Sequence, residues 1–317
     1  MPVKLSTYLK KTYGEKVYRL SLSSGCGCPN RDGSICYDSK RDDYYIGEKV
    51  PGTQVITGGC SFCSEGGSGE FASIGTDIDA QINAAKELVC RKTDARKFIA
   101  YFQSYTNTYG DVDRLRKLYL RAISRDDIVA LSIGTRPDCL GPEVLSMLKE
   151  LQAIKPVWVE LGLQTIHEAT ARQIRRGYKL QTFEESYRKL KEIGITVVIH
   201  VIFGLPGETP EDMLNTICYL SDISPVLDGI KIQNLQVIKG TDICRDYEER
   251  GEEAFHVMTM EEYTDLVAKA IALLPKETVV HRMTGDGPRR LLVAPLWSLD
   301  KKRVLNMLTK KTRDILE

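Results

Sequence analysis

Gly25-Cys-Gly-Cys-Pro-Asn-Arg-Asp-Gly33 and Gly58-Gly-Cys-Ser-Phe-Cys-Ser-Glu-Gly-Gly-Ser-Gly-Glu-Phe71 stand at the two ends of the stretch around which the rest of this chain is organised. Five of the nine cysteines lie between residues 25 and 73. Two of them, Cys60 and Cys63, are separated by two residues in a glycine-rich setting. Both thiolates can therefore face one metal centre, while the glycines let the backbone fold around it. The stretch predicts a metal-binding loop.

Length and composition fit an ordinary globular protein. The 317 residues, 42% of them hydrophobic, suffice for one large α/β domain or for a barrel with an appendage. No run of eighteen apolar residues occurs, and the N-terminal segment lacks the apolar centre of a secretory signal. We therefore expect a cytoplasmic protein without a membrane segment. In that compartment, nine cysteines indicate metal ligands or buried small side chains rather than a disulfide framework.

Strand-like and helical patterns alternate along most of the chain. Six strand signals are separated by helices of crossover length, including a helix around 168–176, which favours a parallel α/β architecture with right-handed connections. We predict a partial, TIM-like (β/α)6 barrel over residues 1–241 and a C-terminal α/β extension over 242–317. The extension is expected to pack on the barrel, because no Pro-, Ser- or Gly-rich tether precedes it. The predicted strands are 17–22, 97–102, 128–133, 157–161, 196–203 and 229–235.

Polar residues follow the strands of this predicted barrel. In such folds the carboxyl ends of the strands gather the chemically active side chains at one face. The polar clusters 103–109, 134–138, 160–165, 204–208 and 236–241 each come at or directly after a predicted strand. We therefore expect them to surround the mouth of the barrel, together with the cysteine loop.

Eight segments of the chain resemble the radical SAM superfamily, and within it the branch related to the elongator catalytic subunit and the bacterial YhcC-like proteins. The resemblance covers nearly the whole chain and implies the radical SAM form of the barrel. It also implies a [4Fe–4S] cluster held by three cysteines, with S-adenosylmethionine (SAM) chelating the open iron. The segments that carry the resemblance are 28–33, 59–63, 67–71, 101–108, 134–138, 160–165, 200–208 and 284–289.

The resemblance implies Cys28, Cys60 and Cys63 as cluster ligands, with Phe62 as the aromatic residue before the third cysteine. The interval between the first two ligands, 31 residues, is longer than in the proteins that the chain resembles, and it contains Cys36. Cys26 and Cys36 therefore compete with Cys28. We favour Cys28 because Pro-Asn-Arg-Asp-Gly follows it.

A structural zinc site is the alternative for the cysteines. Cys26, Cys28, Cys60 and Cys63 could supply four thiolates to one zinc ion. Such a site explains neither the polar strand ends nor the repeated strand–helix pattern.

The remaining candidates line the predicted mouth or the barrel interior. Arg136 could pair with a carboxylate through two hydrogen bonds. Lys231 and Gln233 alternate along the sixth strand, so both could face inward, where a lysine is costly unless it is paired. These three are the predicted catalytic residues. His200 is equally compatible with a satisfied core residue and a site contact. The predicted cofactor contacts are Phe62, Gln103, Tyr105, Asn107, Glu160, Gln164, His200 and Gly204.

The resemblance implies reductive cleavage of SAM to a 5′-deoxyadenosyl radical, with an external one-electron donor such as flavodoxin or ferredoxin. It suggests tRNA as substrate, with the 5-side chain of the wobble uridine converted from carboxymethylaminomethyl to aminomethyl. Between Arg282 and Arg313 nine basic residues stand against two acidic ones, which is typical of a surface that contacts phosphates. The alternatives are a radical SAM enzyme acting on a peptide or metabolite, and a zinc-dependent nucleic-acid-binding module.

Overall fold

The structure is a computed structural model that describes residues 2–64, 66, 77–285 and 287–316. The predicted motif Gly67–Phe71 lies outside the described residues, as does Asp286.

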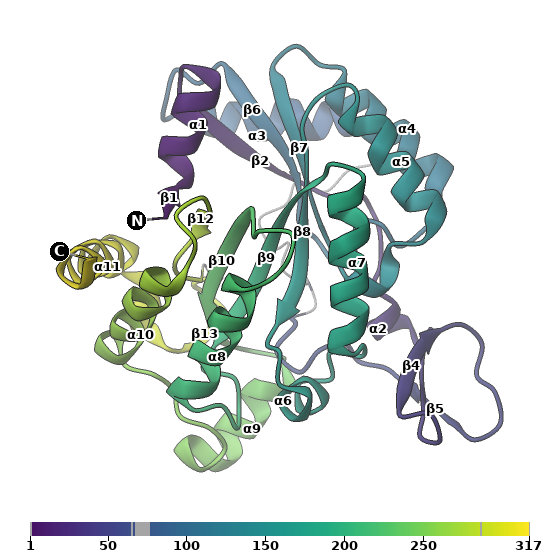
Figure 1. The fold of residues 1–317 in the computed structure, drawn as a ribbon, viewed down its shortest axis with the longest axis vertical. Coiled ribbons are helices and arrows are strands. Elements are labelled where there is room, and N and C mark those ends of the chain that lie inside the picture. The colour runs from purple at the N-terminus through teal and green to yellow at the C-terminus, as the bar shows by residue number, and fades with distance from the viewer. Residues whose placement is uncertain (1, 65, 67–76, 286, 317) are drawn as a thin grey trace.

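Six parallel strands form the curved sheet of a half-barrel (Figure 1). The predicted strands are confirmed, and they pair in chain order from β2 to β10. Short alternating or continuous runs of Val, Ile, Leu and Phe explain why these segments are strands, and all of them except the first are largely buried on both faces. The strands are β2 Val17–Leu22, β6 Lys97–Phe102, β7 Ile128–Thr135, β8 Val157–Gln164, β9 Thr196–Phe203 and β10 Gly229–Asn234.

Helices connect successive strands and run along the outside of the sheet (Figure 1). Their apolar faces and the outward-facing strand residues form the main hydrophobic core. Side-chain caps fix the residues at which several of these helices begin. Asp77 accepts a hydrogen bond from Asp79 N, Asp111 accepts one from Arg114 N, and Thr209 forms a capping box. The connecting helices are α3 Ile78–Cys90, α4 Val112–Ile123, η1 Pro137–Cys139, α5 Pro142–Gln152, α6 Glu168–Gln173, α7 Leu180–Glu192 and α8 Pro210–Ser221.

Segments from both ends of the chain extend the same sheet. Strand β12, Val279–Arg282, pairs with β10, and β1, Val3–Lys4, pairs with β12. Helix α10, Met260–Leu273, packs against α8 and α11. The boundary at residue 241 stays a prediction. The other elements are α1 Leu5–Tyr13, β11 Val237–Ile238, α9 Asp242–Arg250, η2 Gly251–Glu253, β13 Leu292–Ala294, η3 Leu296–Leu299 and α11 Lys301–Leu316.

The long interval between Cys28 and Cys60 forms a separate small sheet that projects from the barrel (Figure 1). This insertion begins with the short helix α2, Pro29–Asp32. Its three antiparallel strands then pair in the order β4-β3-β5. Asp42 anchors it to the barrel through Arg172 Nη2 at 2.8 and 2.9 Å and Lys179 Nζ at 2.7 Å. The strands are β3 Ile35–Asp38, β4 Asp43–Ile46 and β5 Thr53–Ile56.

Across the described ranges, we find no helix with both the length and the apolar character needed to cross a membrane.

Candidate active site at the barrel mouth

A cavity of about 170 Å³ opens at the carboxyl ends of the strands. The cysteine loop forms one of its walls. Residues of β6, β7, β8, β9 and β10 or directly after them form most of the rest, together with Arg176 and Tyr178 from the loop after α6.

Cys28, Cys60 and Cys63 all line this cavity. Cys28 precedes the first turn of α2, while Cys60 and Cys63 share a turn in which Cys63 N donates to Cys60 O at 2.9 Å. Asn30 Nδ2 contacts Cys60 Sγ at 3.3 Å. Burial raises the pKa of Cys60, and it raises the pKa of Cys63 to about 12. Binding of a metal centre must therefore displace the thiol protons.

The two competing cysteines lie elsewhere. Cys26 belongs to the main hydrophobic core, where Arg114 Nη2 lies 3.4 Å from its sulfur. Cys36 is fully buried in β3 of the projecting sheet. Neither lines the cavity, so the four-cysteine zinc set is not brought together. Within the described ranges, no three His, Cys, Asp or Glu side chains converge on one point as a single metal ion requires. Cluster thiolates bind separate irons and need no such convergence.

Two arginines stabilise the wall of the cavity. Arg136 forms a two-point ion pair with Asp138, at 2.9 and 2.7 Å, and donates to Arg176 O at 2.9 Å. Its guanidinium lies over the ring of Tyr178. The carboxylate predicted to pair with Arg136 is thus supplied by the chain itself.

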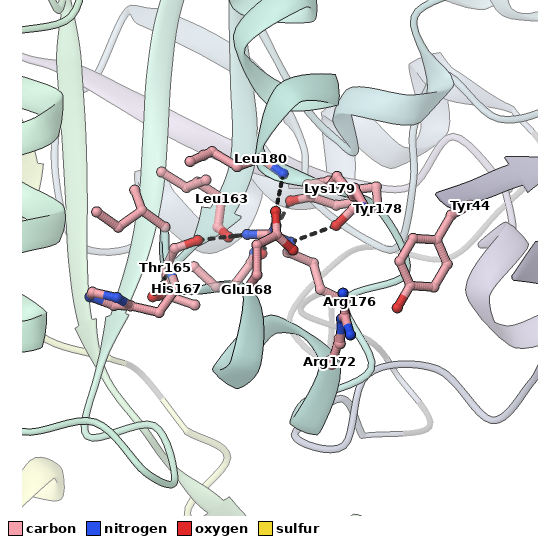
Figure 2. Close-up of polar contacts among 12 residues, drawn as sticks. Tyr44, Leu163, Thr165, His167, Glu168, Arg172, Arg176, Tyr178, Lys179 and Leu180 are labelled. Atoms are coloured by element: carbon pink, nitrogen blue, oxygen red, sulfur yellow. Dashed lines mark hydrogen bonds and ion pairs between the residues drawn. The ribbon is translucent and has the colours of Figure 1, made fainter. Parts of the chain in front are cut away.

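Arg176 was not among the residues predicted from the sequence, yet it is 1% exposed and lines the cavity. Figure 2 shows it bridging the end of β8 to the following loop. Its guanidinium donates to the carbonyls of Leu163, Thr165 and Tyr178 at 3.1, 2.6 and 3.1 Å and lies 3.7 Å from Glu168. The sequence gives no signal that separates Arg176 from its neighbours Arg172 and Arg175.

A polar layer crosses the barrel interior at the floor of the cavity. Glu160 is its centre: Ser132 Oγ and His200 Nε2 lie 2.8 Å from the carboxylate, and Lys231 Nζ donates to it. Arg19 Nη2 lies 3.6 Å away. Burial alone would raise the pKa of Glu160, but Lys231 and Arg19 hold it well below its ordinary value. We define the polar layer as Arg19, Tyr101, Ser132, Glu160, His200 and Lys231.

The layer also sets the charge of its histidine. Burial, together with the positive charge of Lys231, lowers the pKa of His200 to about 4. The imidazole is therefore neutral near pH 7.

Most predicted site residues meet at the cavity. Tyr105 and Gln164 adopt left-handed backbone conformations, with φ of 56° and 66°, a strain that is concentrated at functional sites in proteins. Lys231 lies fully buried beneath Glu160 rather than in the lining. The predicted residues in the lining are Cys28, Cys60, Phe62, Cys63, Gln103, Tyr105, Arg136, Glu160, Gln164, His200 and Gln233.

Two residues that were predicted to contact the cofactor lie outside the cavity lining. Asn107 is buried, where it accepts from Ser24 Oγ at 2.6 Å and donates to the carbonyls of Phe102 and Gly134. Gly204 faces Met258, whose methyl would lie 2.9 Å from an added Cβ. The structure therefore gives both residues a supporting position outside the cavity lining.

Comparison with known proteins relates both parts of the chain to one family. Residues 50–220 match the family model described as the Radical SAM superfamily, and residues 227–314 match the Radical_SAM C-terminal domain. The YtqA protein of Bacillus subtilis is 38% identical over 97% of this chain and 88% of its own length.

Two further similarities cover smaller parts. A protein of Methanocaldococcus jannaschii named tRNA uridine(34) acetyltransferase is 31% identical over 52% of this chain and 30% of its own length. The solved structure of the archaeal Methanocaldococcus infernus Elp3, with an N-terminal deletion, has a TM-score of 0.62 at 21% identity. It covers 74% of this chain and 59% of the archaeal chain. This structural likeness shows a shared fold.

Proposed function

This chain belongs to the radical SAM superfamily, and from that membership we propose that it modifies the 5-side chain of the wobble uridine in tRNA, converting carboxymethylaminomethyl to aminomethyl. The family is one of enzymes. The observation that carries the proposal is the meeting of three cysteines and the polar strand ends in one cavity.

The cofactors of the superfamily are a [4Fe–4S] cluster and SAM. The residues present fit them, because three thiolates on one cavity wall suit an iron–sulfur cluster and leave one iron without a protein ligand. We assign Cys28, Cys60 and Cys63 as the ligands. When bound, the pair of cofactors supplies a 5′-deoxyadenosyl radical that abstracts a hydrogen atom from the substrate.

The chain's own residues would orient SAM and exclude water. Gln103, Tyr105 and Gln164 are the proposed contacts, since all three line the cavity and two have strained backbones. Arg136 and Arg176 would hold the cavity wall, and Asn107 would hold the loop that carries Gln103 and Tyr105.

The tRNA assignment draws on the relative named tRNA uridine(34) acetyltransferase and on the basic C-terminal segment. In α11, Lys301, Lys302 and Arg303 are exposed. Lys311, further along the helix, forms ion pairs with Glu261 and Asp265, both at 2.7 Å. The exposed group is the proposed phosphate contact. We further propose a cytoplasmic location and an electron donor of the flavodoxin or ferredoxin type.

Anaerobically reconstituted protein with SAM, reductant and tRNA bearing carboxymethylaminomethyluridine tests the proposal. We expect 5′-deoxyadenosine, methionine, free glyoxylate and, in the digested tRNA, aminomethyluridine, all dependent on Cys60. The carboxymethyl group would leave as glyoxylate after the substrate has lost the abstracted hydrogen atom and one further electron, which would return to the cluster, and water has added to the resulting imine. Formation of 5′-deoxyadenosine with unchanged tRNA would favour a peptide or metabolite substrate. Protein that binds zinc but no iron would favour the nucleic-acid-binding alternative.

A further inference from the structure

Asn30 is a fully buried residue that contacts the cysteine loop. It lies in α2, close behind Cys28, and is 0% exposed. Its Nδ2 donates to Arg175 O at 2.6 Å and to Cys60 Sγ at 3.3 Å. Its backbone carbonyl accepts a hydrogen bond from Gly59 N at 2.8 Å. Asn30 therefore joins the proposed ligand Cys60 to the loop after α6 that carries Arg175.

The contact with Arg175 decides which end of the amide faces the sulfur. A carbonyl oxygen only accepts hydrogen bonds, so the atom 2.6 Å from Arg175 O must be the amide nitrogen. That nitrogen carries two protons, one for Arg175 O and one for Cys60 Sγ. Rotation of the amide by half a turn would set Oδ1 against two acceptors, the carbonyl and the sulfur. The fold therefore aims an N–H group at the sulfur of Cys60.

The other end of the amide is left without a partner. Oδ1 is buried, and no described residue donates a hydrogen bond to it. A buried acceptor without a donor costs free energy. The bond to Arg175 O supports the loop with one amide proton, whereas the second proton serves no part of the described fold other than Cys60 Sγ. The sulfur contact is therefore the feature that calls for an amide at this position.

This contact distinguishes Cys60 from the other two proposed ligands. Within the described ranges, no side chain donates a hydrogen bond to the sulfur of Cys28 or Cys63. Cys26 Sγ lies 3.4 Å from Arg114 Nη2, but Cys26 is outside the cavity lining. Of the three proposed ligand sulfurs, that of Cys60 is thus the one that a described side chain stabilises through a hydrogen bond.

We propose that Asn30 raises the reduction potential of the [4Fe–4S] cluster by donating a hydrogen bond to the sulfur of Cys60. The inference rests on the proposed function, because Cys60 must be a cluster ligand. In the step concerned, one electron passes from the flavodoxin- or ferredoxin-type donor to the cluster, and the amide keeps both of its protons. Asn30 acts through Cys60 and is therefore a positioning residue.

The physical reason is the charge that the cluster gains on reduction. The reduced cluster carries one more negative charge, part of which lies on its thiolate sulfurs. An N–H group aimed at a sulfur stabilises that charge, and hydrogen bonds to the sulfurs are among the factors that set the potential of such clusters. The buried position of Asn30 keeps water from screening the interaction. Loss of the N–H group should therefore make the cluster harder to reduce.

A redox titration of reconstituted protein, without SAM or tRNA, tests this inference in the absence of turnover. The reduced cluster is followed by electron paramagnetic resonance. In Asn30→Ala the ratio of reduced to oxidised cluster at a fixed potential should fall about tenfold, which equals a shift of about 59 mV for a one-electron couple. Asn30→Asp, which keeps the size of the side chain and loses both amide protons, should shift the potential at least as far in the same direction.

Asn234→Ala is the matched control. Asn234 is also a buried asparagine, 4% exposed, and it lies outside the cavity lining. Its Nδ2 donates to Leu235 O, and its Oδ1 accepts from Gly285 N at 2.9 Å. The substitution therefore removes buried hydrogen bonds without touching a sulfur. It should leave the reduction potential unchanged.

A second measurement does not depend on the folding of any Asn30 variant. Parent protein is labelled with nitrogen-15 in the side-chain amide of asparagine, and the reduced cluster is examined by pulsed electron paramagnetic resonance. We expect a coupling between the electron spin and one amide nitrogen, transmitted through the hydrogen bond to Cys60. The coupling should persist in Asn234→Ala and disappear in Asn30→Asp.

The possible results are distinct. Full cluster content with an unchanged potential in Asn30→Ala, or no nitrogen-15 coupling in the parent, overturns this inference alone. Equal shifts of potential in Asn30→Ala and Asn234→Ala also overturn it, because they would reflect a general loss of structure. If Cys60→Ala keeps its cluster iron, the proposed ligand set fails and the inference fails with it.

Discussion

Lys231 Nζ donates a hydrogen bond to the carboxylate of Glu160 inside the barrel, and neither side chain has any exposed surface. A buried ion pair of this kind usually contributes less stability than well-packed apolar residues in its place. The fold alone therefore does not call for it. Because Glu160 lines the cavity and contacts His200, we infer that the pair serves to position groups of the site.

Removing one partner of this pair should lower the free energy of unfolding far more than removing the charge of both partners. Lys231→Met leaves Glu160 buried without its ammonium partner, so we expect a loss of about 3–5 kcal/mol in the free energy of unfolding. Lys231→Met combined with Glu160→Gln should recover most of that loss. Anaerobic urea unfolding of both variants measures the effect. A single variant as stable as the parent would contradict the buried ion pair.

The cysteines should separate into two groups. Replacing Cys28, Cys60 or Cys63 with Ala should abolish the brown colour and the cluster iron of reconstituted protein, because each supplies a thiolate. Cys26→Ala and Cys36→Ala are the matched controls, since both sulfurs are buried away from the cavity. Iron and sulfide analysis measures the cluster content of each variant. Retention of iron by Cys28→Ala, with loss in a control, would reassign the first ligand.

Arg176 should resist even conservative replacement. Lys cannot reach three carbonyls as the planar guanidinium does, so Arg176→Lys should lower the free energy of unfolding by about 2–3 kcal/mol and weaken SAM binding. Arg172→Lys, at a side chain 49% exposed, is the control and should change little. Urea unfolding and calorimetric titration with SAM provide the two measurements. If Arg176→Lys and Arg172→Lys had the same stability and the same SAM affinity, Arg176 would not be a support of the cavity wall.

Acid should destabilise the protein partly through His200. Because its pKa falls from the ordinary 6.5 to about 4 on folding, the unfolded chain binds this proton more readily. The free energy of unfolding therefore keeps the full contribution of His200 above pH 6.5. It loses up to about 3 kcal/mol of that contribution as the pH falls from 6.5 towards 4. The comparison of urea unfolding between parent and His200→Gln across this range isolates the effect. Parallel pH profiles would show that His200 is not buried as a neutral imidazole.

The basic helix should govern RNA affinity through salt. Replacement of Lys301, Lys302 and Arg303 with Ala should weaken tRNA binding and reduce the salt dependence, by a slope of roughly 0.7 to 0.9 per lost phosphate contact. Cluster content should not change. Lys10→Ala with Lys11→Ala, exposed on α1, is the control. If the triple variant binds tRNA with the parent's affinity and salt slope, α11 is not the RNA contact.

Sequence patterns predicted the barrel well because its signals are local. The apolar runs at 97–102 and 196–203 coincide with β6 and β9, and helices of crossover length separate them. The predicted helix around 168–176 ends instead at Gln173, because Arg175 is left-handed and Arg176 turns back to bond with the end of β8. The end of this helix depends on contacts of Arg176 with residues 11 and 13 positions earlier in the chain, which helical periodicity does not report.

The candidate site was predictable to the same extent and for the same reason. Residues at strand ends, such as Gln103 and Gln164, follow from chain order because parallel strands end at one face. The partners of Glu160 come from four different strands, and the projecting sheet between Cys28 and Cys60 is built by pairings within a polar insertion. Such pairings depend on three-dimensional register, which composition and spacing do not encode.

The pairing of Val3 with Val279 joins residues 276 positions apart, and it places β1 at the outer edge of the sheet. During synthesis β1 therefore stays without this partner until β12 has been made. Since β12 also brings Arg282 next to Gln233, the same late event completes the surroundings of the cavity. Contacts between such distant segments form slowly. Assembly of the site thus depends on the pairing of β12, which joins the sheet after the six central strands in chain order.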